Sequence, residues 1–317
     1  MNKKILIAGG AGFIGSNLCE ALVNRGDFVL CLDNFVTGSE NNIKDLFKFN
    51  NFSMIEGDVT DINLLHKLDL KFDIIINLAC IASPKAYYKY PIETLLTSVV
   101  GTRNLLDLTR RTGARLIQAS TSEVYGDPDV NVLLENYNGN VNCTGPRACY
   151  DEGKRAAETL CVDYARIYNL CVQIVRIFNT YGPKMAYEDG RAIPEFICRA
   201  LRNEEIRIFG SGDQTRSFMF ISDLINALLV LIDSNNHPHG PFNIGNPNEE
   251  YSISSIAQII KNLIKSDSKI IFQPKMEDDP RKRKPSIELF KKIYNWTPSV
   301  SIEEGLLKTI KYFKSHV

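Results

Sequence analysis

The sequence predicts an α/β protein with a doubly wound parallel sheet and a smaller α/β C-terminal lobe. Three observations predict this fold. Short apolar runs alternate with helical patterns over the first two-thirds of the 317 residues, a glycine-rich turn follows the first run, and the pattern loosens after Asn179. Alternating strands and helices are typical of parallel sheets that helices cover on both faces.

The expected elements follow one another in this rhythm. Strands are expected at residues 5–8, 28–32, 52–55, 74–78, 116–119 and 172–178, and helices at 15–25, 99–111 and 150–168. Helical periodicity returns at residues 194–201, 222–232, 252–264 and 302–313. We therefore expect a nucleotide-binding domain over residues 1–178, rejoined by parts of 217–246, and a substrate lobe over 179–317, with the ligand between them.

Composition excludes several classes of function. Lys plus Arg equals Asp plus Glu, at 37 each, so the net charge predicts neither a nucleic acid nor an anionic membrane as partner. No signal peptide is apparent and no apolar run approaches the roughly 20 residues of a membrane-spanning helix. Eight cysteines form no C-x-x-C pair and the four histidines form no cluster with ligand spacing. We expect reduced thiols, a cytoplasmic location and no metal site.

The turn after the first strand has the glycine spacing of a dinucleotide-binding loop. Gly10, Gly12 and Gly15 fit G-x-G-x-x-G, and Gly9, Gly12 and Gly15 fit G-x-x-G-x-x-G. Small residues allow the turn its unusual dihedrals and let a pyrophosphate approach the amides at a helix N-terminus. The sequence therefore predicts a Rossmann-type fold whose cofactor contacts include Gly9, Gly12, Phe13, Ile14 and Gly15.

A carboxylate ends the second strand. Asp33 follows Gly15 by 18 residues, close to the ~20 expected of the acid that binds the ribose hydroxyls. Because a carboxylate repels a 2′-phosphate, NAD is favoured over NADP; the alternative is a solvated strand end. Asp58 could reach the adenine or could cap the next helix. The predicted cofactor site also includes Asn34, Val59 and Leu78.

A tyrosine and a lysine lie four residues apart in "CYDEGKRAAE". On a helix, Tyr150 and Lys154 would share one face. The lysine ammonium and an oxidised nicotinamide would favour the phenolate, so the tyrosine could act as a base on a sugar hydroxyl. The same spacing is common on helix surfaces, but the upstream dinucleotide loop favours the catalytic interpretation.

Seven segments together carry a family resemblance: "GGAGFIG", "STSEVYGD", "GPRACYDEGKR", "RIFNTYGP", "GSGDQTRSF", "FNIGNP" and "RKRKPSI". They resemble the extended short-chain dehydrogenase/reductase family that modifies nucleotide sugars, and are most similar to its members that decarboxylate UDP-glucuronate. The resemblance runs nearly the whole length of the chain.

The resemblance implies roles for the matched positions. Thr121 would bind the sugar O4, Tyr150 would be the base there with the help of Lys154, and Arg283 would meet the sugar carboxylate. The remaining substrate contacts that it implies are Tyr87 in a substrate loop and, around the UDP group, Asn179, Arg191, Gln214 and Arg216. Arginine matches phosphate geometry, although Arg191 and Arg216 could also be surface charges.

The pair Ser122-Glu123 separates related reactions. Similar sugar dehydratases have aspartate where this chain has Ser122, and a serine hydroxyl is too weak an acid for the departing C6 hydroxyl. The resemblance implies oxidation at C4, loss of carbon dioxide from the resulting β-keto acid, protonation at C5, and return to UDP-xylose with NAD regenerated. Glu123 would lie near the carboxylate or manage the C5 proton, and Ser122 would donate a hydrogen bond. A cap on the following turn is the alternative for both.

Other interpretations stay open at this stage. They are a uronate 4-epimerase, a decarboxylase that releases the 4-keto pentose with NADH, and a catalytically silent NAD-sensing protein. The resemblance also implies a homodimer through a four-helix bundle. The helices at 99–111 and 150–168 carry extra apolar residues that suit it, including Leu105, Leu108, Leu160 and Tyr164. Burial of these residues within one chain is the alternative.

Overall fold

The computed structural model describes residues 2–68, 70–187, 189–275 and 281–316. Its strands are β1 (Lys4–Ala8), β2 (Phe28–Asp33), β3 (Phe52–Glu56), β4 (Ile74–Asn77), β5 (Arg115–Thr121), β6 (Val172–Ile177), β7 (Thr180–Tyr181), β8 (Ile206–Phe209), β9 (Thr215–Ser217), β10 (Met219–Phe220), β11 (Phe242–Ile244), β12 (Glu250–Ser252) and β13 (Ile270–Gln273). Its α-helices are α1 (Phe13–Asn24), α2 (Ile62–His66), α3 (Pro84–Lys89), α4 (Pro91–Leu96), α5 (Thr102–Thr112), α6 (Ala148–Tyr168), α7 (Ala192–Leu201), α8 (Ile221–Asp233), α9 (Ile253–Ile264), α10 (Glu288–Tyr294) and α11 (Ile302–Lys314). Three short 3-10 helices are described, η1 (Glu40–Asn42), η2 (Lys44–Lys48) and η4 (Ser122–Tyr125), and one π-helical turn, η3 (Thr97–Gly101).

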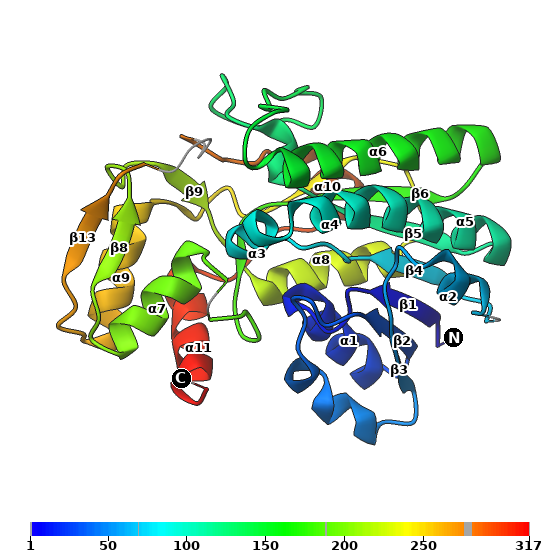
Figure 1. Cartoon of the computed structure of the whole chain (residues 1–317), viewed down its shortest axis with the longest axis horizontal. Coiled ribbons are helices and arrows are strands. Elements are labelled where there is room, and N and C mark those ends of the chain that lie inside the picture. The colour runs from blue at the N-terminus through cyan, green and yellow to red at the C-terminus, as the bar shows by residue number, and fades with distance from the viewer. Residues whose placement is uncertain (1, 69, 188, 276–280, 317) are drawn as a thin grey trace.

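Seven strands form one parallel sheet in the order β11-β6-β5-β4-β1-β2-β3. The order reverses direction on either side of β1, which is the doubly wound arrangement. The predicted fold class is therefore confirmed, and Figure 1 shows the sheet between its two layers of helices.

The alternation of side chains along each strand feeds two separate apolar cores. In β1, Ile5 and Ile7 join the core that contains α1 and α8, whereas Leu6 and Ala8 join the core that contains α5 and α6. All four side chains are 0% exposed. This two-sided burial explains why Ile5 to Ala8 of β1 form a continuous apolar run rather than an alternating one.

The smaller lobe is built from residues after β6. Strands β8 and β13 pair in parallel, β9 and β12 pair antiparallel, and α7, α9 and α11 pack beside them (Figure 1). Strand β11 returns to the large sheet beside β6. The boundary between residues 178 and 179 stays a prediction.

Two of the four apolar residues that we singled out as candidates for a dimer interface are buried within their own chain. Leu105 and Leu108 are 0% and 3% exposed, so burial within one chain is the correct interpretation for them. Leu160 and Tyr164 pack against the same core but are only partly buried. None of the helices in the described ranges has both the length and the apolar composition that a membrane crossing requires.

Candidate active site

The glycine turn between β1 and α1 leaves one open position. Gly9 has a φ of +77°, and a Cβ on Gly15 would lie 2.1 Å from the Gly9 carbonyl oxygen, so the turn itself requires both glycines. A Cβ on Gly12 would meet only that same oxygen, at 3.3 Å. Gly12 is the N-cap of α1 and no side chain caps the helix. Bare amides beside open space fit a phosphate group.

Asp33 ends β2 next to this turn. Its side chain is 8% exposed, which is inconsistent with a solvated strand end. One carboxylate oxygen accepts from the Ala11 amide at 2.9 Å and the other from the Phe35 amide at 2.9 Å. Burial raises the pKa of Asp33 against these hydrogen bonds. The acid is thus held rigidly at the rim of a pocket.

That pocket brings together much of the predicted cofactor set. Its lining includes Gly9, Gly12, Asp33, Asn34, Val59 and Leu78. Phe13, Ile14 and Gly15 follow directly in the first turn of α1. Asp58 accepts from the Asn34 side chain at 2.8 Å and from the Thr60 amide at 2.8 Å. The cap of α2 is Asp61 rather than Asp58, so the capping alternative for Asp58 is wrong.

Tyr150 and Lys154 lie in the first turns of α6, next to the end of β5. Both are nearly buried, at 8% and 4% exposed. The Lys154 ammonium donates to the Ala119 carbonyl at 3.0 Å. Burial raises the pKa of Tyr150, and a hydrogen bond with Thr121 opposes that rise. The protein alone therefore holds Tyr150 as a neutral phenol, and a base role needs a further positive charge beside it.

Tyr87 of α3 covers the other side of this tyrosine. The two rings are stacked with centroids 5.5 Å apart and planes 11° apart. Tyr87 is 1% exposed, and its hydroxyl has no hydrogen-bond partner among the described residues. A buried hydroxyl without a partner is costly, so this atom is available to a ligand.

The end of β5 carries the carboxylate that organises the site. The Thr121 side chain accepts from the Glu123 amide at 3.3 Å and so caps η4, which makes Thr121 the capping residue rather than Ser122 or Glu123. The Glu123 carboxylate accepts from both terminal nitrogens of Arg283 and from Arg147. Burial opposes ionisation, but the charges of Arg283 and Arg147 lower the pKa of Glu123 to about 2.

Arg283 reaches this point from the far end of the chain. Its side chain is 3% exposed, and its Nε has no partner among the described residues. The Ser217 amide donates to its carbonyl at 3.2 Å, which fixes the segment against β9. Both terminal nitrogens of Arg283 therefore donate to Glu123, and its buried Nε remains as a donor for another group.

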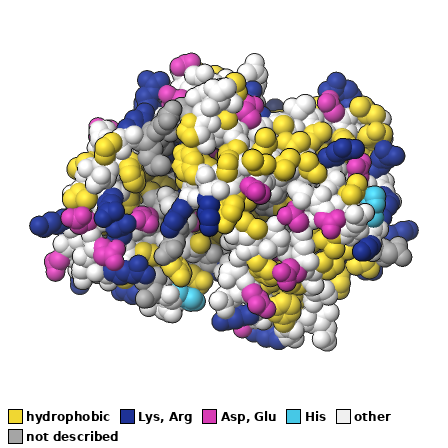
Figure 2. Space-filling model, viewed as in Figure 1, with side chains coloured by type: hydrophobic (Ala, Val, Ile, Leu, Met, Phe, Trp, Pro, Cys, Tyr) yellow, Lys and Arg dark blue, Asp and Glu magenta, His cyan; other side chains and the backbone are white. Residues whose placement is uncertain are grey.

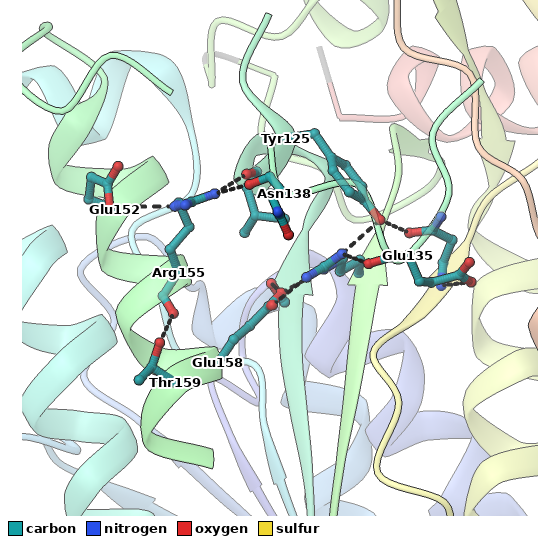
Figure 3. A network of polar contacts seen from close by, with 11 residues as sticks. Tyr125, Glu135, Asn138, Glu152, Arg155, Glu158 and Thr159 are labelled. Atoms are coloured by element: carbon teal, nitrogen blue, oxygen red, sulfur yellow. Dashed lines mark hydrogen bonds and ion pairs between the residues drawn. The ribbon is translucent and has the colours of Figure 1, made fainter. Parts of the chain in front are cut away.

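A buried polar network connects η4 and α6 to the segment that carries Arg283. Arg176 of β6 donates to the two Glu158 carboxylate oxygens, at 2.9 and 2.7 Å, and to the Tyr125 hydroxyl at 2.9 Å. Tyr125 in turn donates to Asn243 at 2.7 Å. Figure 3 shows Tyr125, Glu135 and Glu158 converging in this network. Asn243 also donates to the Ser286 carbonyl at 3.2 Å, so the network ties η4 and α6 to the segment that carries Arg283.

The residues expected around a UDP group lie in the smaller lobe or at its entrance. Arg216 is 6% exposed, so it is not a surface charge, and its charge acts on Glu123. Gln214 donates to the Phe209 carbonyl at 2.7 Å. Asn179 is half-buried between β6 and β7. Arg191 donates to Asp189 at 2.6 Å and lies over the Phe13 ring, 5.9 Å from its centroid.

Two residues of this site were missed in the sequence. Arg147 precedes α6 and contacts Glu123, and Asp151 lies one turn further, with one carboxylate oxygen 3.8 Å from the Arg147 Nε. The i, i+4 spacing of Arg147 and Asp151 is a signal that was present. It was overlooked because the predicted helix began at Tyr150.

The fold and the glycine turn define a protein of the dinucleotide-binding, Rossmann-type class. Comparison with known proteins agrees at the level of the family. The sequence model of the NAD dependent epimerase/dehydratase family matches residues 5–245, so the chain belongs to this family. The family resemblance inferred from the motifs is confirmed.

Individual proteins to which the chain is similar include decarboxylases and an epimerase of UDP-glucuronic acid. The chain is 47% identical over 315 residues to UDP-glucuronic acid decarboxylase 1 of Xenopus tropicalis, covering 99% of this chain and 73% of that protein. It is 47% identical over 307 residues to UDP-glucuronic acid decarboxylase 6 of Arabidopsis thaliana, covering 96% and 87%. The solved UDP-glucuronic acid 4-epimerase of Bacillus cereus, in complex with UDP-glucuronic acid and NAD, is 27% identical with a TM-score of 0.89, covering 99% and 100%.

Proposed function

We propose that this protein is an NAD-dependent decarboxylase that converts UDP-glucuronate to UDP-xylose. The observation that carries the proposal is the hydrogen bond from buried Arg283 to Glu123. Glu123 lies two residues after Thr121, which contacts Tyr150. The identity of 47–48% to UDP-glucuronic acid decarboxylases over nearly the whole chain supports the same reaction.

The cofactor would bind along the carboxyl ends of β1, β2 and β4. Gly12 and the first turn of α1, with Phe13 and Ile14, would hold the pyrophosphate, and Asp33 would take the ribose hydroxyls. Asn34, Asp58, Val59 and Leu78 would surround the adenine side of the pocket. When bound, NAD supplies the oxidation at the sugar C4 that turns the carboxylate into a β-keto acid, and later the reduction that gives the pentose.

Tyr150 would remove the proton from the sugar O4. Thr121 would bind the same oxygen, since it already contacts Tyr150. Lys154, fixed by its bond to the Ala119 carbonyl, would add positive charge at this helix face. The raised pKa of the buried Tyr150 means that the phenol gives up its proton only when positive charge on the bound cofactor is added.

Arg283 would bind the sugar carboxylate through its Nε, which does not contact Glu123. Its unpartnered Nε is a buried donor, and a carboxylate is the ligand that best satisfies it. Tyr87 would donate its free hydroxyl to the same ligand. Ser122, 2% exposed, would donate a hydrogen bond, and Glu123 would limit how strongly the ground-state carboxylate is held.

The UDP group would lie against the smaller lobe. Arg216 and Arg191 would meet the diphosphate, and Gln214 and Asn179 would take polar contacts along the nucleotide. Arg191 would first have to leave Asp189, which it contacts through two nitrogens. Arg216 lies on β9, which is hydrogen-bonded to the segment of Arg283, and Gln214 directly precedes that strand. Arg191 is the N-cap of α7, and Asn179 lies between β6 and β7.

The test uses purified protein with UDP-glucuronate and follows released carbon dioxide and the nucleotide sugars by mass spectrometry. Loss of carbon dioxide with formation of UDP-xylose is expected. A product of unchanged mass would identify a uronate 4-epimerase, for which the likeness to the Bacillus cereus enzyme is the specific argument. Accumulating NADH with a 4-keto pentose would identify the shortened reaction, and binding of NAD without any turnover would identify a sensor.

We also propose that the protein forms a homodimer through a four-helix bundle, with the exposed apolar side chains on α4 and α6 rather than on the helix expected at residues 99–111. Large apolar side chains are exposed there, at 68% for Ile92, 39% for Leu95, 46% for Leu96 and 44% for Val162. Figure 2 shows a hydrophobic band over the part of the surface where these helices lie. A charge at Leu96, as in Leu96→Glu, should halve the mass seen by light scattering, whereas Leu307→Glu on α11, at 51% exposed, should not. A monomeric wild type would contradict the proposal.

A cytoplasmic location stays a prediction. Its support is that all eight cysteines are free thiols.

A further inference from the structure

Asp151 is a buried acid that the reaction outlined above does not use. It is 7% exposed and lies on α6 directly after Tyr150. Its Oδ1 has no hydrogen-bond partner among the described residues, and its Oδ2 is 3.8 Å from the Arg147 Nε, beyond hydrogen-bond reach. A carboxyl group in this position gains little from being charged.

The charged surroundings of Asp151 come from several elements. Glu123 comes from η4, Arg283 from the segment before α10, and Tyr87 from α3. Helix α6 and the residue before it add Cys149, Tyr150, Glu152 and Arg147. Of the other elements packed on this part of α6, η3 has no ionisable side chain and the acid of α4, Glu93, is exposed. The two arginines and Glu123 therefore decide the state of Asp151.

The two arginines favour Glu123 over Asp151. Glu123 receives hydrogen bonds from Arg147 and from both terminal nitrogens of Arg283. Asp151 receives none of these. Burial and the negative charge of Glu123 accordingly raise the pKa of Asp151 to about 7, while the same arginines lower that of Glu123. Glu123 therefore carries the negative charge, and Asp151 is the group that holds a proton.

The charges of this cluster leave room for one more anion. Among the groups that contact Glu123 directly, Arg147 and Arg283 contribute two positive charges and Glu123 one negative charge. Arg216 also acts on Glu123 and is counted with the diphosphate that we propose it meets. With Asp151 neutral the four groups sum to +1, which one sugar carboxylate neutralises. With Asp151 ionised the sum is zero, and a further carboxylate would enter a buried site without a counter-charge.

We propose that Asp151 is a proton-holding residue of the carboxylate site, which must be protonated when the carboxylate of the nucleotide sugar is bound. It acts through Arg147 and Glu123 and is a positioning residue for substrate recognition. This inference rests on the proposed function, because it takes a sugar carboxylate as the ligand of Arg283.

The inference has a consequence that binding experiments measure directly. Because the carboxylate binds with protonated Asp151, its binding takes up a proton wherever free Asp151 is ionised. The affinity for UDP-glucuronate should then fall as the pH rises above about 7, approaching tenfold per pH unit. UDP-xylose has the same nucleotide and diphosphate but no carboxylate, so its affinity should lack this dependence.

The experiment is calorimetric titration of the NAD-bound full chain carrying Tyr150→Phe, which stops turnover. Titrations in buffers of different ionisation enthalpy give the number of protons taken up. We expect most of one proton per site for UDP-glucuronate at pH 8, almost none at pH 5.5, and none for UDP-xylose at either pH. Equal proton uptake for both ligands, or none for UDP-glucuronate at pH 8, would overturn the inference.

A pair of second substitutions assigns the proton. Adding Asp151→Asn, which mimics the neutral acid, should abolish proton uptake and flatten the pH dependence of the dissociation constant. Adding Glu152→Gln, the neighbouring half-buried acid that pairs with Arg155, should preserve the proton uptake at pH 8. The fall in affinity should move only towards lower pH, because the charge of Glu152 raises the pKa of Asp151. Uptake that persists with Asp151→Asn would assign the proton elsewhere and refute the proposal.

The proposed function is judged separately, by carbon dioxide release from the wild type. Release of carbon dioxide without proton uptake would sink the role of Asp151 alone. No release of carbon dioxide would sink the proposed function instead.

Discussion

The contact of Glu123 with two arginines predicts a specific dependence of stability on pH. Arg283 and Glu123 are 3% and 14% exposed in their side chains, so water screens this pair little. Burial opposes the charge of Glu123, but the arginines lower its pKa from 4.5 to about 2. At about 1.4 kcal/mol per pH unit, the difference corresponds to about 3 kcal/mol of folding free energy.

The sign follows from which state binds the proton more tightly. The unfolded chain protonates Glu123 near its ordinary pKa, whereas the folded chain resists protonation down to about pH 2. The stabilisation is therefore fully present above about pH 4.5 and is lost as the pH falls towards 2. The variant Glu123→Gln cannot titrate, and it removes the carboxylate that contacts both Arg147 and Arg283. Asp151 can then ionise more easily beside Arg147, which offsets part of this loss. At neutral pH it should lose about 3–5 kcal/mol of unfolding free energy.

The assay is urea unfolding of the wild type and Glu123→Gln between pH 7 and pH 3. The gap between the two should shrink by about 1.4 kcal/mol for each pH unit below about 4.5. The matched control is Glu304→Gln, which removes an exposed pair with Lys308 and should cost about 0.5 kcal/mol at most. A gap that stays constant from pH 6 to pH 3 would refute the ion-pair assignment, whatever its size at pH 7.

Three further substitutions test the cofactor and substrate sides of the site. Tyr87→Phe removes a buried hydroxyl that has no partner among the described residues, so thermal unfolding should show no loss of stability. Turnover of UDP-glucuronate should nevertheless fall, and unchanged turnover would remove Tyr87 from the substrate site. Gly12→Ala should keep the fold, because its Cβ meets one atom at 3.3 Å, but should weaken NAD binding in titrations. Gly15→Ala should instead lose the fold itself, because its Cβ would lie 2.1 Å from the Gly9 oxygen, and a stable Gly15→Ala protein would contradict this geometry.

The sheet was predictable because its central strands β1, β2 and β4 contain continuous apolar runs buried on both faces. The six predicted strands of the large sheet all exist within about two residues of their expected ends. The helices α3 and α4 were missed because each has only six residues, too few for a periodic pattern. A signal was present, since Ser83 caps α3 and a proline opens each helix.

The candidate site was only partly predictable. Cofactor residues cluster along the first 80 positions, where the order of strands places them at one edge of the sheet. The contact of Arg283 with Glu123 spans 160 residues, and no local pattern contains it. The resemblance named both residues but not their direct contact, and it did not name Arg147 or Asp151. These depend on how the start of α6 packs against η4, which is a property of the tertiary fold.

The charges around position 122 explain why a serine, rather than an aspartate, suits an acidic substrate there. Ser122 is 2% exposed and precedes Glu123, which already binds two guanidinium groups. An aspartate there would add a third carboxyl group to a cluster that has two arginines. Either it would stay protonated and could act as an acid, or it would ionise and cancel the positive charge that a sugar carboxylate needs. The neutral serine keeps that positive charge for the substrate, so the residue that lacks acid–base chemistry is the one that permits an acidic sugar.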